Sequence, residues 1–445
     1  MSSDLDFETA YTKLNPEQKI AVDSIDGAVI VIAGPGSGKT QLLSLRVANI
    51  LKQTDALANS ILCLTFTESA ANNMRERLAS IIGREAHKVA IHTFHSLGSE
   101  IINQNPEYFF FGSGYNPSDE LAQFKILRSI FQSLSWANPL NSYNPITEEY
   151  SYLKDVQASI KALKSGGLSP VDFLNLLDLN AGFINFLNPL LQDFFDARLT
   201  QNHIQKLPEL IHNLQTFKSD SDLSTNTFPS LQATTLRQLE QVLINTQNTE
   251  LNRQKTRPIS EWKKKFMTYD NSKRLVHKDS KNLPKQYALL EIYQQYQDSL
   301  HQQKLYDFED MLLEVVKVLK KPNTQNLKFN LQEKYQYILV DEFQDTNGVQ
   351  IELLDNLIDA ESASGNPNIM VVGDDDQAIF KFQGASVQNI IQFKQKFPQA
   401  KQVTLTKNYR STQNILDIAM GVIELSDERL AKIDGIDKQL VSMVK

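Results

Sequence analysis

A glycine-rich loop between a short apolar run and an amphipathic stretch constrains this chain more than any other feature. The segment GAVIVIAGPGSGKT spans residues 27–40, and LLSLRVANIL follows it with apolar residues at helical spacing. The order of strand, glycine loop and helix is typical of a phosphate-binding loop, although Ala33 stands where the strict motif has glycine. Glycines let backbone N–H groups turn inward around phosphate oxygens, and the following helix offers its N-terminus to the anion. The sequence therefore predicts a nucleotide phosphate site, against the alternative of a plain glycine turn.

The predicted loop residues have distinct expected roles. We expect Lys39 to neutralise charge on the β- and γ-phosphates, and the hydroxyl of Thr40 to help hold Mg²⁺. The remaining contacts are expected from backbone groups. The predicted phosphate-loop set is Ala33, Gly34, Pro35, Gly36, Ser37, Gly38, Lys39 and Thr40.

Two adjacent carboxylates follow a second apolar run. The residues YILV lead into Asp341 and Glu342, which places both acids at the end of a buried strand, where open α/β sheets bind ligands. Asp341 is suited to a contact with Mg²⁺, and Glu342 to orienting and deprotonating an attacking water molecule. A pair of acids at a strand end is more often a solvated turn, but the phosphate loop favours the functional interpretation.

Strand and helix patterns alternate in the first part of the chain and return after residue 330. Alternation of this kind predicts an α/β fold with a parallel, doubly wound sheet. Between them, apolar residues at helical spacing indicate a large all-helical insertion. The predicted organisation is a first α/β segment over 1–112, the insertion over 113–300, a second α/β segment over 301–397, and an incomplete further α/β domain over 398–445.

Composition limits the class of protein but not its partner. The chain has 445 residues and a formal net charge of −7, so a local positive groove is compatible with the sequence but a basic coat is not. Cys63 is the single cysteine, which excludes an intramolecular disulfide and Cys-rich zinc sites. No run of about 18 apolar residues occurs, so we expect no membrane partner and a cytoplasmic protein.

Seven ordered blocks resemble the UvrD/PcrA/Rep group of superfamily 1 DNA helicases. The resemblance covers residues from about 14 to about 415, apart from the insertion. The blocks are LNPEQKIAV (14–22), CLTFTESAANNMRERL (63–78), HTFHSL (92–97), YDFEDML (306–312), DEFQDT (341–346), VVGDDDQAIFKFQGAS (371–386) and LTKNYRST (405–412).

This resemblance implies roles at the nucleotide. Gln18 would read the adenine edge through its amide, and Tyr409 would stack on the base. Gln377 would lie between the γ-phosphate and the DNA site, and Arg410 would donate to the γ-phosphate. With Lys39 and Glu342, the last two complete the implied catalytic set, and ATP and Mg²⁺ are the implied cofactors.

The resemblance also implies a track for single-stranded DNA. Aromatic side chains at Phe66, Phe380 and Phe382 would stack on bases, and stacking is worth about 1–3 kcal/mol per base. Burial in the core is an equal alternative for Phe66. Thr65, Thr93 and His95 would contact the DNA backbone, with a structural role as the alternative for the histidine.

The implied function is that of an ATP-dependent 3′→5′ DNA helicase, a hydrolase acting on single-stranded and duplex DNA in DNA repair. Because the family's later motifs are absent, we expect a RecA-like α/β domain with a partial second one, in a fragment. The alternative is a nucleotide-dependent DNA-binding module that needs a second, C-terminal helicase polypeptide, or repair partners, to unwind DNA. Two positions depart from the family: Gln41 replaces an arginine expected beside adenine, and Phe382-Gln383-Gly384 replaces Trp-Arg-Gly. Arg46, one turn further on, is not assumed to replace the missing arginine.

Overall fold

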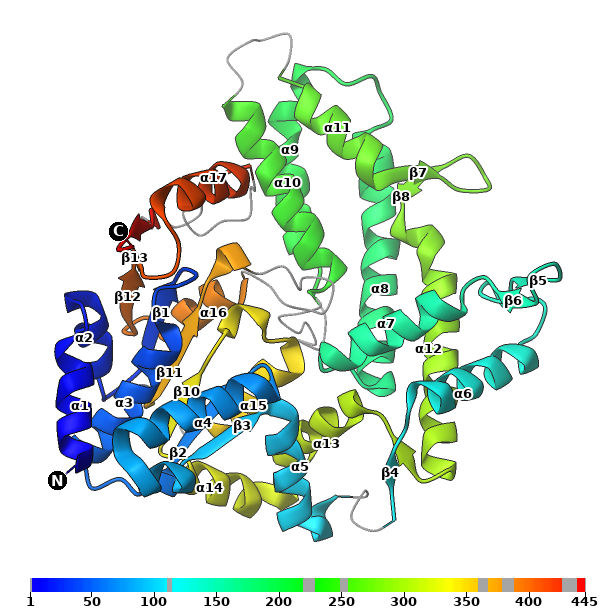
Figure 1. Ribbon diagram of the computed structural model, residues 1–445. Helices are drawn as coiled ribbons and strands as arrows, with labels where there is room; N and C mark the ends of the chain where they lie inside the picture. Colours follow the sequence, from blue (N-terminus) through cyan, green and yellow to red (C-terminus); the bar gives the residue numbers. More distant parts are fainter. Residues whose placement is uncertain are drawn as a thin grey trace. The chain divides into compact units, whose positions relative to one another are not determined.

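The computed structural model describes residues 2–109, 114–218, 229–248, 255–358, 367–377, 388–425 and 438–444. The chain forms two compact units (Figure 1). Unit 1 comprises Met1–Tyr115 and Phe308–Lys445, and unit 2 is the inserted segment Asn116–Asp307. The domain borders suggested by the sequence, after residues 112, 300 and 397, stay predictions.

A six-stranded sheet forms the centre of unit 1. Every pairing in it is parallel, and the strand order is β12-β1-β11-β10-β2-β3. The predicted α/β class with a parallel sheet is therefore confirmed. The segment after residue 398 contributes to this sheet, because its strand β12 pairs with β1. The strand bounds are β1 Val29–Ala33, β2 Ile61–Thr65, β3 Ala90–Thr93, β10 Tyr337–Val340, β11 Ile369–Gly373 and β12 Lys401–Leu405.

Both faces of this sheet are covered, which explains the nearly continuous apolar runs of its strands. Val29 and Val31 belong to one core with residues of four N-terminal helices, whereas Ile30 and Ile32, equally buried, face the other way. The four helices are α1 Ser2–Thr12, α2 Pro16–Asp23, α3 Lys39–Gln53 and α4 Glu68–Ile82. The second layer consists of α5 Phe94–Gln104, α13 Phe308–Lys320, α14 Gln325–Lys334, α15 Gly348–Leu357 and α16 Gln388–Lys396 (Figure 1).

Helices dominate unit 2, as predicted, but three ladders of two-residue or three-residue strands interrupt them. Strands this short carry no period that a sequence pattern can show. Within the described residues, no helix is both long and apolar enough to cross a membrane. The helices are α6 Glu120–Ser133, α7 Leu153–Ser165, α8 Pro170–Phe194, α9 Gln201–Gln215, α10 Leu231–Gln247, α11 Arg257–Phe266 and α12 Asp279–Gln302. The ladders pair β4 Asn116–Pro117 with β9 Leu305–Tyr306, β5 Tyr143–Asn144 with β6 Glu149–Tyr150, and β7 Met267–Tyr269 with β8 Leu275–His277.

A buried ion pair joins helix α7 to the last residue of unit 2. Lys164, at the end of α7, has a fully buried side chain, and its Nζ lies 2.5 Å from Oδ2 of Asp307 and 2.9 Å from Oε1 of Gln297. The same ammonium lies 5.0 Å from the ring centroid of Tyr296, whose hydroxyl donates to Asp307. Polar partners and an aromatic face together compensate the charge for its loss of water.

Lys164→Met is expected to lower the free energy of unfolding by about 3–5 kcal/mol, because it leaves the Asp307 carboxylate buried without its cation. The double variant Lys164→Met/Asp307→Leu removes both charges and should recover most of the loss. Urea unfolding monitored by circular dichroism measures both, with Lys154→Met on the exposed side of the same helix as control. Equal losses in Lys154→Met and Lys164→Met would show that the ion pair does not stabilise the unit.

Candidate nucleotide site

The parallel sheet brings the predicted site residues to one edge. Because all six strands run the same way, their C-terminal ends meet there. Apart from Gln18 on α2, the residues predicted to bind nucleotide lie at or after the ends of four neighbouring strands, β12, β1, β11 and β10. The next two strands, β2 and β3, carry Thr65 and Thr93. The sheet order therefore separates Thr65 and Thr93 from these nucleotide residues, whereas Phe380 and Phe382 follow β11 in the sequence and lie outside the described residues.

The loop between β1 and α3 has the backbone conformation that its glycines permit. Gly36 and Gly38 have φ values of +69° and +88°, in the left-handed region that L residues rarely adopt. A Cβ atom on Gly36 would lie 2.7 Å from Cβ of Arg410, so a side chain is excluded there twice over. The hydroxyl of Ser37 donates to the Gly34 carbonyl at 2.7 Å and closes the loop on itself.

Gln18 lies under this loop with its side chain buried. Its Nε2 donates to the Ser37 carbonyl at 2.8 Å, and its Oε1 accepts from the backbone N–H of Asn15 as part of a capping box that begins α2. In this structure the amide thus supports the phosphate loop. Its predicted contact with adenine stays a prediction.

The segment after β12 returns to the same loop. The backbone N–H of Tyr409 donates to the Gly36 carbonyl at 2.9 Å, and Nδ2 of Asn408 donates to the Pro35 carbonyl at 2.5 Å. Tyr409 is half-exposed, and its hydroxyl accepts from Asn15. Sequence reasoning missed Asn408, which is almost fully buried and also accepts from the backbone N–H of Arg410. Its position inside the LTKNYRST block was the available signal.

Arg46 does not take the place of the arginine missing beside adenine. Its guanidinium is buried and donates to the carbonyls of Ala21, Ser24 and Ile25 at the end of α2. Every one of these acceptors is backbone, so the side chain ties α2 to α3 and has a structural role.

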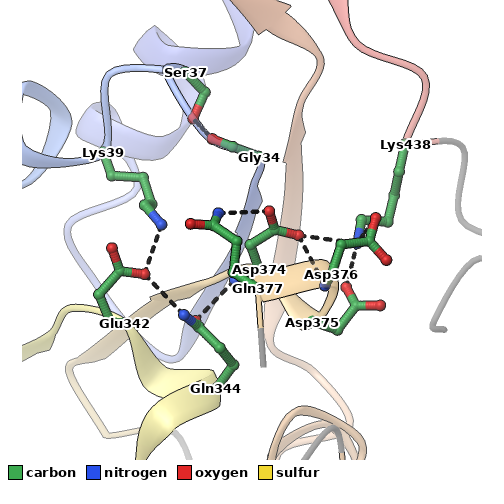
Figure 2. A network of polar contacts seen from close by, with 10 residues as sticks. All are labelled: Gly34, Ser37, Lys39, Glu342, Gln344, Asp374, Asp375, Asp376, Gln377 and Lys438. Atoms are coloured by element: carbon green, nitrogen blue, oxygen red, sulfur yellow. Dashed lines mark hydrogen bonds and ion pairs between the residues drawn. The ribbon is translucent and has the colours of Figure 1, made fainter. Parts of the chain in front are cut away.

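Lys39 and Glu342 form an ion pair across the site (Figure 2). Nζ of Lys39 lies 2.6 Å from Oε2 of Glu342, and their side chains are 11% and 32% exposed. Glu342 has a φ of +48°, an uncommon backbone conformation for a residue other than glycine. Such conformations persist where the surroundings impose them, and they are concentrated at functional sites. The phosphate loop and the strand-end carboxylate are thus in direct contact.

A second row of polar contacts extends this pair towards β11. Nε2 of Gln344 donates to Oε2 of Glu342 at 2.9 Å, and its Oε1 accepts from the backbone N–H of Asp374 at 2.9 Å. Oδ2 of Asp374 accepts from Nε2 of Gln377 at 2.6 Å (Figure 2). The structure therefore connects Gln377 to Lys39 through Glu342 and through two residues, Gln344 and Asp374, that were not selected from the sequence. Both lie inside blocks that were recognised.

The carboxyl of Asp341 is nearly inaccessible to solvent. Its burial, and then the neighbouring charge of Glu342, raise its pKa from 3.8 to about 6. The same two causes raise the pKa of the less buried Asp345 to about 6. Both groups therefore ionise at a cost in this structure, and a cation placed between them and the loop would offset that cost.

Asp341→Asn is expected to raise the free energy of unfolding at pH 8 by about 3 kcal/mol, since about two units of raised pKa cost about 1.4 kcal/mol each. The folded chain holds this proton more tightly than the unfolded chain does, so the cost of ionisation grows as the pH rises from about 4 to about 6. At pH 5 the gain should be about half as large. Urea unfolding at both pH values tests this, with the exposed Asp298→Asn as control. A gain that is independent of pH would contradict the assignment.

Four residues predicted to contact DNA, Thr65, Phe66, Thr93 and His95, lie at or just after the ends of β2 and β3, and their exposure differs. Phe66 is 36% exposed, so it is not a core residue. The hydroxyl of Thr93 begins α5 as its N-cap and donates to Glu68 at 2.9 Å, and Thr65 is buried. The ring of His95 packs edge-on against the ring of Phe308, with 6.2 Å between the ring centroids. Phe380 and Phe382 lie outside the described residues.

Comparison with known proteins supports the resemblance read from the motifs. The family model for the UvrD/REP helicase N-terminal domain matches residues 14–226 and 193–398. The chain is 25% identical to the ATP-dependent DNA helicase PcrA of Leuconostoc citreum over 96% of its length, and 27% identical to the helicase Rep of Buchnera aphidicola over 97%. A probable DNA helicase II homolog of Rickettsia conorii is 29% identical, again over 97% of the chain.

These alignments cover 41%, 47% and 48% of the three relatives, so the chain spans less than half of their length. The motifs, the parallel sheet and the loop with its paired carboxylate agree with the matched family over most of the chain. The resemblance predicted from the sequence is confirmed: the chain belongs to the UvrD/REP helicase family and corresponds to its N-terminal domain.

Proposed function

We propose that this chain binds ATP and hydrolyses it to drive movement on single-stranded DNA, as part of an ATP-dependent 3′→5′ DNA helicase. The contact between Lys39 and Glu342 carries the proposal, because it places a phosphate-binding cation beside a carboxylate able to act on water. Around them the glycine loop offers backbone donors. The backbone of Tyr409 and Cβ of Arg410 lie next to Gly36.

The ion pair suggests how the site changes when nucleotide enters. Lys39 would exchange the Glu342 carboxylate for phosphate oxygens, which releases the carboxylate to accept a proton from the attacking water molecule. The water oxygen then bonds to the γ-phosphorus while the bond to the ADP oxygen breaks. Gln377 and Arg410 would donate hydrogen bonds to the transferring group, whose negative charge attracts planar, charged donors.

The residues present fit a magnesium ion. Asp341 is a buried carboxyl whose ionisation costs free energy in this structure, and Thr40 is a hydroxyl in the first turn of α3. Oxygen ligands of this kind are those that Mg²⁺ takes from proteins beside nucleotide phosphates. When bound, the ion supplies positive charge to the phosphate oxygens.

The DNA track would follow the neighbouring ends of β2 and β3. Phe66, which is 36% exposed, would stack on a base, and such stacking needs no particular sequence. The hydroxyl of Thr93 donates to Glu68, and the ring of His95 packs against Phe308. Contacts of these two residues with DNA would be additional to these interactions within the chain.

A second candidate function rests on the coverage of the relatives. Since the chain spans less than half of their length, it would then act as a nucleotide-dependent DNA-binding module, completed for unwinding by a C-terminal helicase polypeptide. This function predicts ATP-dependent DNA affinity with no turnover.

Two assays distinguish the candidates. ATP hydrolysis is measured with and without oligo(dT), and nucleotide binding is measured by fluorescence with a labelled ATP analogue. Turnover stimulated by DNA supports the motor, whereas binding without turnover supports the module. A chain that binds no nucleotide contradicts both. Partial duplexes with a 3′ or a 5′ tail then test the direction of movement in the presence of the C-terminal polypeptide.

A further inference from the structure

A lysine outside every recognised sequence block contacts the three aspartates that follow β11. Lys438 is 7% exposed, and its Nζ lies 3.0 Å from Oδ1 of Asp374 and 3.0 Å from Oδ2 of Asp376. It also forms an ion pair with Asp375. Burial alone would lower the pKa of Lys438, but the three carboxylates outweigh it and raise the pKa above its ordinary value. The ammonium is therefore charged and offsets three successive negative groups.

One of these carboxylates connects the lysine to the predicted catalytic set. Asp374 uses Oδ1 for Lys438 and Oδ2 for Nε2 of Gln377, so both oxygens are engaged at once (Figure 2). Gln377 borders a cavity of about 420 Å³, which gives its amide room to turn. The hydrogen bond from Gln377 to Asp374 therefore sets the direction of the amide, and Lys438 fixes the carboxylate that receives it.

The segment that carries Lys438 is anchored beside the phosphate loop. Strand β14, Val441–Ser442, pairs in parallel with β13, Lys407–Asn408, immediately before Tyr409. The side chain of Leu440 packs on Gly34, where an added Cβ would lie 2.8 Å from its Cδ2. Ser442 also donates to the Ser411 carbonyl at 2.8 Å. These contacts hold Lys438 in place independently of its ion pairs.

We propose that Lys438 is a positioning residue for ATP hydrolysis, which holds Asp374 so that the amide of Gln377 is directed at the transferring phosphate. The proposal deepens the proposed function and rests on it. Lys438 would also couple strand β14 to the end of β11, because a displacement of β14 would move the cation that orients Gln377. Lys438 itself need not touch the nucleotide.

The test compares steady-state hydrolysis by the full chain and by Lys438→Met, which keeps most of the length of the side chain and removes its charge. We expect kcat to fall about 10- to 100-fold with KM changed less than about twofold, because the lost orientation matters in the transition state. Lys438→Arg should recover much of the rate, since a guanidinium also pairs with carboxylates. Lys401→Met, an exposed lysine on β12, is the matched control and should hydrolyse ATP normally.

A double variant separates positioning from general destabilisation. If Lys438 acts through Gln377, Lys438→Met should have no further effect in a Gln377→Ala background. If the two substitutions lowered kcat by independent factors that multiply in the double variant, or if Lys438→Met left kcat unchanged, the proposal would be overturned while the proposed function stayed intact. So would an equal loss of rate in Lys438→Met and Lys438→Arg together with a lowered Tm. A wild-type chain without any hydrolysis overturns the proposed function and this inference with it.

Discussion

Lys39→Ala is expected to lower the rate of ATP hydrolysis about 10²- to 10³-fold and to weaken nucleotide binding. The ammonium is the cation that the phosphate loop presents, and it is largely shielded from water, with 11% of the side chain exposed. In a shielded site a charge interacts more strongly with phosphate oxygens than it would in solvent. The substitution also leaves Glu342 without its ion-pair partner.

Hydrolysis and the affinity for a labelled ATP analogue are measured together for this variant. Lys52→Ala is the matched control, because Lys52 belongs to the same helix α3 and also pairs with a glutamate, Glu8. The control should keep both activities. Wild-type affinity and turnover in Lys39→Ala would mean that the loop is not the phosphate site, and the chain's family membership would then not extend to its chemistry.

The phosphate loop could be predicted because its information is local. A strand, a glycine turn and a helix lie within 27–40 and the stretch after it, and the positive φ values of Gly36 and Gly38 are those that the pattern requires. The carboxylates after β10 were predicted for the same reason. The contact between Glu342 and Lys39 joins residues about 300 positions apart. The sequence indicated this contact only indirectly, through the parallel sheet that the alternating strands predict.

Other contacts lay beyond the reach of the sequence because they depend on pairs with no fixed spacing. Asn408 binds the Pro35 carbonyl, and Lys438 binds Asp374, yet neither residue differs in type from many exposed neighbours. Gln18 was assigned to adenine, and that contact stays a prediction; the sequence did not indicate that its amide also donates to the Ser37 carbonyl. Polar side chains can satisfy either kind of partner, so residue type alone does not decide between them.

Exposure was the other property that patterns left open. Phe66 follows a fully buried strand, and burial in the core was an equal alternative to a surface position because phenylalanine is commonly buried. The structure resolves this, because the strand ends at Thr65 and the chain turns before α4 begins at Glu68. Lys164 is the opposite case: a lysine in a helical pattern reads as solvated, but unit 2 encloses it between α12 and Asp307.

Glu342→Gln is expected to lower the rate of hydrolysis about 10²- to 10⁴-fold, the range that general bases contribute, while ATP binding is retained. The amide has nearly the shape of the carboxylate, and its oxygen can still accept from Lys39 and Gln344, but it cannot take a proton from water. Nucleotide binding should tighten slightly, because Lys39 no longer breaks an ion pair when it binds the phosphates. The variant therefore separates binding from chemistry, which Lys39→Ala does not.

The matched control for this variant is Glu352→Gln on α15, whose carboxylate also pairs with a lysine and is similarly exposed, at 29% against 32%. Single-turnover hydrolysis and analogue binding are compared for the two variants. If Glu342→Gln hydrolysed ATP at the wild-type rate, the base would have to be another carboxylate of the site. Asp345 would then be the next residue to substitute, because burial and the charge of Glu342 raise its pKa to about 6, which suits proton transfer near neutral pH.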